Sequence, residues 1–128
     1  MSASREPRGT GSGTSYAPLV ALVGQPNCGK TTLFNSLTGS RFRTVNYPGA
    51  TVEYSVGAAH RDLGLAARFL DSPGISSLNA RSPDERVTVE ALFNHPTLGV
   101  PDLVVMVVDA SQLSRHLYLA RQIQASGF

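Results

Sequence analysis

The chain has 128 residues, room for one domain at most, and its 41% apolar and 16% charged residues are typical of a soluble globular protein. Its net charge of +2 is too small to favour nucleic acid or an anionic membrane as a partner. One cysteine excludes an internal disulfide framework, and no apolar run approaches the roughly 18 residues that a membrane span needs. His60, His95 and His116 form no metal-ligand spacing with Cys28, so no protein-built transition-metal site is predicted.

Residues 1–15 are rich in Ser, Gly, Thr and Arg and contain almost no large apolar side chain. Such a segment cannot bury enough surface to offset the entropy lost on ordering, so we expect a disordered tail. The apolar runs and the motifs described next lie in residues 16–128, which we expect to form the folded domain.

The strongest local signal is Gly24-Gln25-Pro26-Asn27-Cys28-Gly29-Lys30-Thr31, which fits the phosphate-binding pattern G-x-x-x-x-G-K-[ST]. An apolar run over residues 19–23 favours a strand before it, and residues 32–37 carry apolar groups at helical spacing after it. This order suits phosphate binding, because the glycines let successive N–H groups face one concavity and the helix N-terminus adds partial positive charge. The pattern predicts that Lys30 reaches the outer phosphates and that the Thr31 hydroxyl ligates Mg²⁺.

Residues 41–54 contain the turn sequence Asn46-Tyr47-Pro48-Gly49 and are predicted to form a loop, with a strand over residues 52–56. Thr51 is a candidate second Mg²⁺ ligand, since such loops in nucleotide switches are ordered by γ-phosphate and Mg²⁺. An ordinary threonine at the start of a β-strand fits the same spacing equally well.

Another apolar run, residues 65–70, predicts a strand that leads into Asp71-Ser72-Pro73-Gly74. The Asp71 carboxylate would face Mg²⁺ through water, and the Gly74 N–H could approach a γ-phosphate closely because glycine has no Cβ. An Asp-containing turn is the alternative. The position one strand after the phosphate loop favours the functional interpretation.

The remaining residues predict one more loop, two helices and one strand. Residues 75–81 should form a second mobile loop, and a helix should start at Ser82 and run to about Asn94. Residues 103–108 are a nearly uninterrupted apolar run, typical of a strand buried on both faces of a parallel sheet. A last helix carries an apolar stripe that we expect to be core: Leu113, Leu117, Leu119, Ala120 and Ile123.

Together these motifs resemble the translation-factor-like class of P-loop GTPases, and more narrowly the cytosolic G domain of bacterial ferrous iron transport protein B (FeoB). The narrower resemblance, over roughly residues 17–128, depends on Asn46-Tyr47-Pro48-Gly49-Ala50-Thr51-Val52-Glu53 and on Val107-Val108-Asp109-Ala110-Ser111 with Arg115-His116-Leu117-Tyr118-Leu119. It implies an α/β fold, a three-layer sandwich with helices on both faces of a mostly parallel sheet. It also implies a domain incomplete at its C-terminal end, since the guanine-reading Asn-Lys-x-Asp motif does not occur before Phe128.

The resemblance also implies a set of site residues. GTP or GDP would be bound by Gly24, Gln25, Pro26, Asn27, Cys28, Gly29, Lys30, Thr31, Thr32, Asp71 and Gly74. Mg²⁺ would be ligated by Thr31, Thr51 and Asp71, and K⁺, as an activator, by Asn27. The groups expected to act in hydrolysis are Asn27, Lys30, Thr51 and Gly74.

Two positions depart from the usual pattern. Ile75 stands where Ras-like enzymes have a glutamine that orients the attacking water, so hydrolysis should be slow and lean on backbone groups and the cation. Cys28 replaces a common Ser or Thr, and either a tolerated small side chain or a redox-sensitive loop fits that change.

The function implied is a GTP-binding, slowly GTP-hydrolysing regulatory domain of a ferrous iron (Fe²⁺) transporter. Its partner would be the membrane portion of the same transporter, at the cytoplasmic face of the inner membrane, and nucleic acid is not expected to bind. Two alternatives are a ribosome- or tRNA-associated GTPase of the same class, and a nucleotide-binding interaction module without turnover. An unpaired apolar edge at residues 103–108 would favour self-association.

Overall fold

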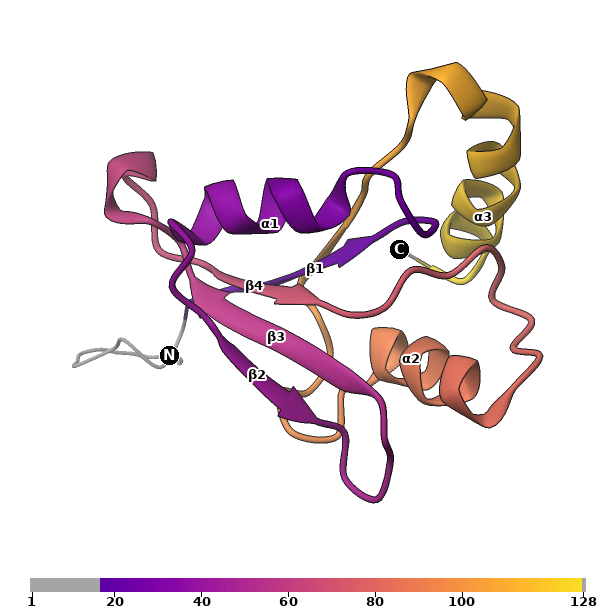
Figure 1. The fold of residues 1–128 in the computed structure, drawn as a ribbon, viewed down its shortest axis with the longest axis horizontal. Coiled ribbons are helices and arrows are strands. Elements are labelled where there is room, and N and C mark those ends of the chain that lie inside the picture. Colours follow the sequence, from indigo (N-terminus) through magenta and orange to yellow (C-terminus); the bar gives the residue numbers. More distant parts are fainter. Residues whose placement is uncertain (1–16, 128) are drawn as a thin grey trace.

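The computed structural model describes residues 17–127, so the tail expected at residues 1–15 lies outside the described part of the chain. A five-stranded sheet in the order β2-β3-β4-β1-β5 forms the centre of the molecule (Figure 1). The strands are β1 (Leu19–Val23), β2 (Arg43–Asn46), β3 (Glu53–Ala58), β4 (Arg68–Asp71) and β5 (Leu103–Met106). The helices are α1 (Lys30–Thr38), α2 (Pro83–Phe93) and α3 (Leu113–Ala125), with short 3₁₀ turns η3 (Arg61–Leu63) and η4 (Ala110–Gln112).

The sheet is mixed. The central strand β1 pairs in parallel with β4 on one side and with β5 on the other, whereas β3 runs antiparallel to both β2 and β4. The parallel register places Leu22 beside Asp71. The carboxyl ends of parallel neighbours meet at one edge of a sheet, so the loops that follow β1 and β4 are brought together there.

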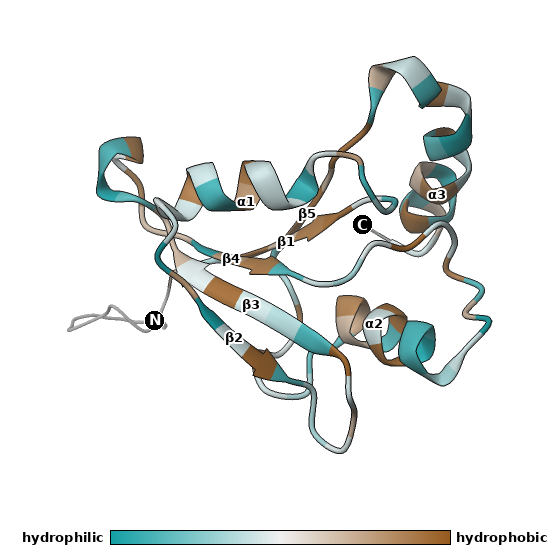
Figure 2. Cartoon of the chain, in the orientation of Figure 1, coloured by the Kyte–Doolittle hydropathy of each residue, from teal (hydrophilic) through white to brown (hydrophobic). Residues whose placement is uncertain are grey.

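The two faces of β1 feed two separate apolar clusters. Val20 and Leu22 join Phe34 of α1 and Phe69 of β4 on one face. The alternate residues of β1 face the other way, into a larger cluster that also contains residues of α2 and α3. Figure 2 shows hydrophobic (brown) stretches on β1, α2 and α3. This alternation follows from the two-residue repeat of a strand. The predicted three-layer sandwich is therefore confirmed, with α1 on one face and α2 and α3 on the other.

Helix α2 matches its prediction. The Ser82 side chain accepts a hydrogen bond from the Glu85 N–H, and Asn94 ends the helix as its C-cap. The prediction of a continuous loop over residues 41–54 was wrong, because residues 43–46 form β2. Its pairing partners are in β3, for example Val45 opposite Tyr54, so the turn residues mark only the end of a β-hairpin.

Two predictions of burial near the C-terminus were also wrong. Among residues 17–127, strand β5 pairs only with β1 and lies at the sheet edge, so Leu103 is 54% exposed instead of buried on both faces. On α3, Leu119 and Ile123 are buried as expected, but Leu113 and Leu117 are each 49% exposed. The buried face of α3 contains His116 in their place, beside Leu119 and Ile123, which join the apolar core. No helix within residues 17–127 is long and apolar enough to cross a membrane.

Candidate functional site

The loop between β1 and α1 is shaped to expose backbone N–H groups. Asn27 and Gly29 both adopt positive φ angles, 64° and 92°, in the left-handed region that turns the chain sharply. Helix α1 begins at Lys30 with no side chain of residues 17–127 capping it, whereas α2 is capped by Ser82. The first-turn N–H groups of an uncapped helix attract an anion, helped by the helix dipole.

Gly24 has a structural reason to be glycine. A Cβ at this position would lie 2.6 Å from the Cys28 sulfur and 2.8 Å from the carbonyl oxygen of Val107. The loop therefore returns directly over its own first residue, and the Cys28 side chain sits half-buried against it. Any larger residue at position 24 would push the loop open.

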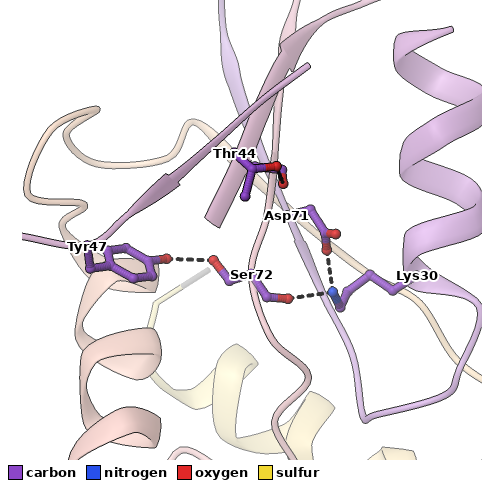
Figure 3. Close-up of polar contacts among 6 residues, drawn as sticks. Lys30, Thr44, Tyr47, Asp71 and Ser72 are labelled. Atoms are coloured by element: carbon purple, nitrogen blue, oxygen red, sulfur yellow. Dashed lines mark hydrogen bonds and ion pairs between the residues drawn. The ribbon is translucent and has the colours of Figure 1, made fainter. Parts of the chain in front are cut away.

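Lys30 and Asp71 meet at the carboxyl edge of the sheet. The Lys30 side chain is only 8% exposed, and its ammonium forms an ion pair with Asp71 and donates a hydrogen bond to the Ser72 carbonyl oxygen (Figure 3). The parallel pairing of β1 with β4 brings the two residues together although 41 positions separate them in sequence. The Lys30 ammonium, which could also pair with a bound phosphate, thus lies directly beside the Asp71 carboxylate that is predicted to support the metal.

The loop after β4 lies against the phosphate loop. A Cβ on Gly74 would stand 2.5 Å from the Pro26 backbone nitrogen, and the Ile75 N–H donates to the Gly24 carbonyl oxygen at 2.9 Å. Only glycine permits this approach without displacing backbone. Ile75 borders the cavity, but its side chain is 5% exposed and packs in the core, and it offers water no hydrogen bond as a glutamine would.

Thr51 lies at the turn of the β2–β3 hairpin. The Tyr47 N–H donates to the Val52 carbonyl oxygen at 2.8 Å, and the Ala50 N–H donates to the Tyr47 carbonyl oxygen at 3.1 Å. These bonds close the turn, so Thr51 belongs to a short ordered hairpin. Its side chain is exposed toward the same cavity as the phosphate loop.

A cavity of about 790 Å³ collects the predicted residues. All of them line it except Gly24, which is buried beneath the loop: Gln25, Pro26, Asn27, Cys28, Gly29, Lys30, Thr31, Thr32, Thr51, Asp71 and Gly74. The hydroxyls of Thr31 and Thr51 and the Asp71 carboxylate supply hard oxygen donors, which fit Mg²⁺. Within residues 17–127 no group of three or more His, Cys, Asp or Glu side chains could hold a metal by itself.

Other residues at the site were missed by sequence reasoning. Asp84, Glu85 and Thr88 reach the cavity from the first turns of α2. Tyr47 is 1% exposed, and its hydroxyl shares a hydrogen bond of 2.6 Å with the Ser72 hydroxyl. Burial raises the pKa of Tyr47 above its ordinary value, so the phenol is neutral at physiological pH. The local pattern predicted the helix start at Ser82 but not that its first turns reach the cavity, and no local pattern signals the contact between Tyr47 and Ser72.

Comparison with known proteins bears on this arrangement of loops. The family model of ferrous iron transport protein B matches residues 19–128. The chain belongs to the ferrous iron transport protein B (FeoB) family. The Fe(2+) transporter FeoB of Methanocaldococcus jannaschii is 43% identical over 108 residues, which are 84% of this chain and 15% of that protein. The resemblance inferred from the motifs is therefore confirmed, and the chain spans about a seventh of this curated relative.

Solved FeoB structures share the fold. The G domain of the T. maritima FeoB iron transporter is 38% identical with a TM-score of 0.74, covering 86% of this chain and 66% of that one. NFeoB from S. thermophilus bound to GDP·AlF₄⁻ and K⁺ is 40% identical with a TM-score of 0.64, covering 83% of this chain and 39% of that one. This chain thus has the P-loop GTPase fold of the FeoB G domain.

Proposed function

We propose that this chain binds GTP and GDP and hydrolyses GTP slowly, as the regulatory domain of a ferrous iron transporter. The observation that carries the proposal is the uncapped N-terminus of α1, which opens beside Lys30 and Asp71 into the same cavity. FeoB relatives solved with GDP support the choice of nucleotide. Membership of the FeoB family favours this function over a ribosome- or tRNA-associated GTPase.

In this proposal the backbone N–H groups at Asn27 to Thr32 hold the phosphates, and the Lys30 ammonium moves from protein oxygens onto the outer ones. The Gly74 N–H contacts the γ-phosphate, where the absence of a Cβ allows close approach. Thr31, Thr51 and Asp71 would hold Mg²⁺ directly or through water. When bound, that ion neutralises charge on the transferred phosphoryl group.

We assign the K⁺ role to Asn27. Its side chain is exposed at the cavity, and the solved S. thermophilus relative that contains K⁺ supports the assignment. A monovalent cation there would neutralise transition-state charge. Hydrolysis by water in line with the γ-phosphate then depends on backbone groups and this cation, because Ile75 offers no hydrogen bond to water.

The proposed partner is the membrane portion of the same transporter. A solved relative described as the cytosolic domain of L. pneumophila FeoB supports a location at the cytoplasmic face of the inner membrane. The exposed edge of β5, with Leu103 54% exposed, offers a second contact surface, and we propose self-association there. No nucleic acid partner is proposed for a chain of net charge +2.

The test is displacement of a fluorescent GTP analogue from this chain by GDP and by ADP, followed by single-turnover hydrolysis with K⁺ or Na⁺. We expect GDP to displace the analogue and ADP to fail, and turnover to be faster with K⁺. Asn27→Ala should remove the difference between the two cations while GDP still binds. Binding without turnover would instead support the interaction module, and equal displacement by both nucleotides would contradict guanine recognition.

A further inference from the structure

A chain of polar contacts connects the β2–β3 hairpin with the phosphate loop (Figure 3). It starts at the Tyr47 hydroxyl, passes through the Ser72 hydroxyl at 2.6 Å, and continues from the Ser72 carbonyl oxygen to the Lys30 ammonium. Lys30 also pairs with Asp71. The hairpin that carries Thr51 and the loop that carries Gly74 are therefore linked at one residue, Ser72.

The Tyr47 end of this series of polar contacts is fixed. Its side chain is 1% exposed, and its ring centroid lies 4.7 Å from that of Tyr54 and 5.2 Å from that of His95. Its N–H is bonded to Val52, which fixes the backbone as well. Burial keeps the pKa of the Tyr47 phenol above its ordinary value, so the O–H remains available to Ser72 at neutral pH. Tyr47 is thus a rigid anchor for Ser72.

The Lys30 end carries the group that a bound phosphate would contact. An ammonium has three N–H donors, and Lys30 donates to the Asp71 carboxylate and to the Ser72 carbonyl oxygen. A bound phosphate needs the same ammonium, so phosphate and the Ser72 carbonyl compete for it. Whatever holds the Ser72 carbonyl in place therefore opposes phosphate binding.

We propose that Tyr47 is a positioning residue that, through Ser72, holds Lys30 on protein oxygens and so weakens nucleotide binding until the contact opens. This inference rests on the proposed nucleotide function. It concerns the regulation of that site: the Ser72 carbonyl oxygen and the phosphates compete for the Lys30 ammonium. The contact resists loading of the site, and binding of phosphate releases the Ser72 carbonyl oxygen from the Lys30 ammonium.

The first experiment measures GDP affinity in Tyr47→Phe, Ser72→Ala and the double variant. Losing one hydrogen bond that opposes binding should tighten GDP binding by about twofold to tenfold. Because both changes remove the same bond, the double variant should match either single one. Two controls should leave the affinity unchanged: Tyr118→Phe, which loses a hydrogen bond accepted from Gln122 on α3, and Ser126→Ala, which loses a bond donated to the Ile123 carbonyl oxygen at the C-cap of α3. A merely structural role for Tyr47 predicts weaker binding instead.

The second experiment needs no nucleotide. Lys30 is the only lysine in the chain, so an amine acylating reagent modifies Lys30 and the N-terminal amine alone, which peptide mass spectrometry separates. Tyr47→Phe and Ser72→Ala should each raise the Lys30 acylation rate severalfold, and the N-terminal amine should not change. Unchanged Lys30 labelling, additive effects or weaker GDP binding would overturn the inference. A wild-type chain that binds no GDP, with the labelling pattern intact, would overturn the proposed function while supporting the hold on Lys30.

Discussion

Replacing Gly74 with alanine should force the loop after β4 away from the phosphate loop. A Cβ there would lie 2.5 Å from the Pro26 nitrogen, 2.8 Å from Pro26 Cα and 2.9 Å from the carbonyl carbon of Gln25. All three are backbone atoms, so no side-chain rotation relieves the overlap. The loop has to move by about 1 Å to restore contacts near 3.5 Å. That movement stretches the 2.9 Å hydrogen bond from Ile75 to Gly24 and disturbs the buried Ile75 side chain.

One lost hydrogen bond and a strained contact together should lower the free energy of unfolding by about 2–4 kcal/mol. Urea unfolding followed by circular dichroism measures that change. Nucleotide binding adds a second readout, because the Gly74 N–H is proposed to contact only the γ-phosphate. Gly74→Ala should therefore weaken binding of a non-hydrolysable GTP analogue about tenfold more than binding of GDP.

Ser76→Ala provides the matched control, since Ser76 is exposed on the same loop and should change neither quantity. The reasoning is refuted if Gly74→Ala unfolds within about 0.5 kcal/mol of the wild type and keeps its ratio of GTP to GDP affinity. A loss of stability with an unchanged ratio would refute the γ-phosphate contact alone.

Three further predictions follow from named contacts. Alkylation of Cys28, which lines the cavity, should abolish GDP binding, and prior GDP should slow the alkylation; full labelling with unchanged affinity would contradict this. Burial lowers the pKa of His95 in the folded protein, so as the pH falls the unfolded chain is protonated at His95 before the folded one. At pH values below about 6.5, the free energy of unfolding measured with urea should therefore decrease, by up to about 1.4 kcal/mol per pH unit. His95→Asn should flatten that dependence. Ser82→Ala should cost about 1 kcal/mol in thermal unfolding, and Ser82→Asp should retain the cap.

Much of the site could be predicted because its signals are contiguous. The phosphate loop occupies eight consecutive residues with a strand before it and a helix after it, and Asp71 ends a short apolar run. Both patterns reflect local conformational demands, positive φ at Gly29 and close approach at Gly74. A backbone that must turn in a specific way constrains the residues next to one another in sequence.

What could not be predicted depends on distant pairing. Strand β2 contains Arg43, Thr44 and Asn46, and its short polar sequence becomes a strand only because β3 lies beside it. The Tyr47–Ser72 contact joins residues 25 positions apart through side chains alone. Helix α3 carries apolar side chains on two neighbouring faces. The face with Leu113 and Leu117 is exposed, and the face with His116, Leu119 and Ile123 is buried. Tertiary packing decided each of these cases.

Helix α3 is hydrogen-bonded to both loops of the site. The Gln25 side chain donates to the Arg115 carbonyl oxygen at 3.0 Å, and the Leu78 N–H donates to the Gln122 side chain at 2.8 Å. Gln25 belongs to the phosphate loop and Leu78 to the loop that follows Gly74. A shift of either loop must therefore stretch a bond to α3 or move the helix with it. Because Leu119 and Ile123 pack one face of α3 into the core, a movement of the helix would also disturb those core contacts.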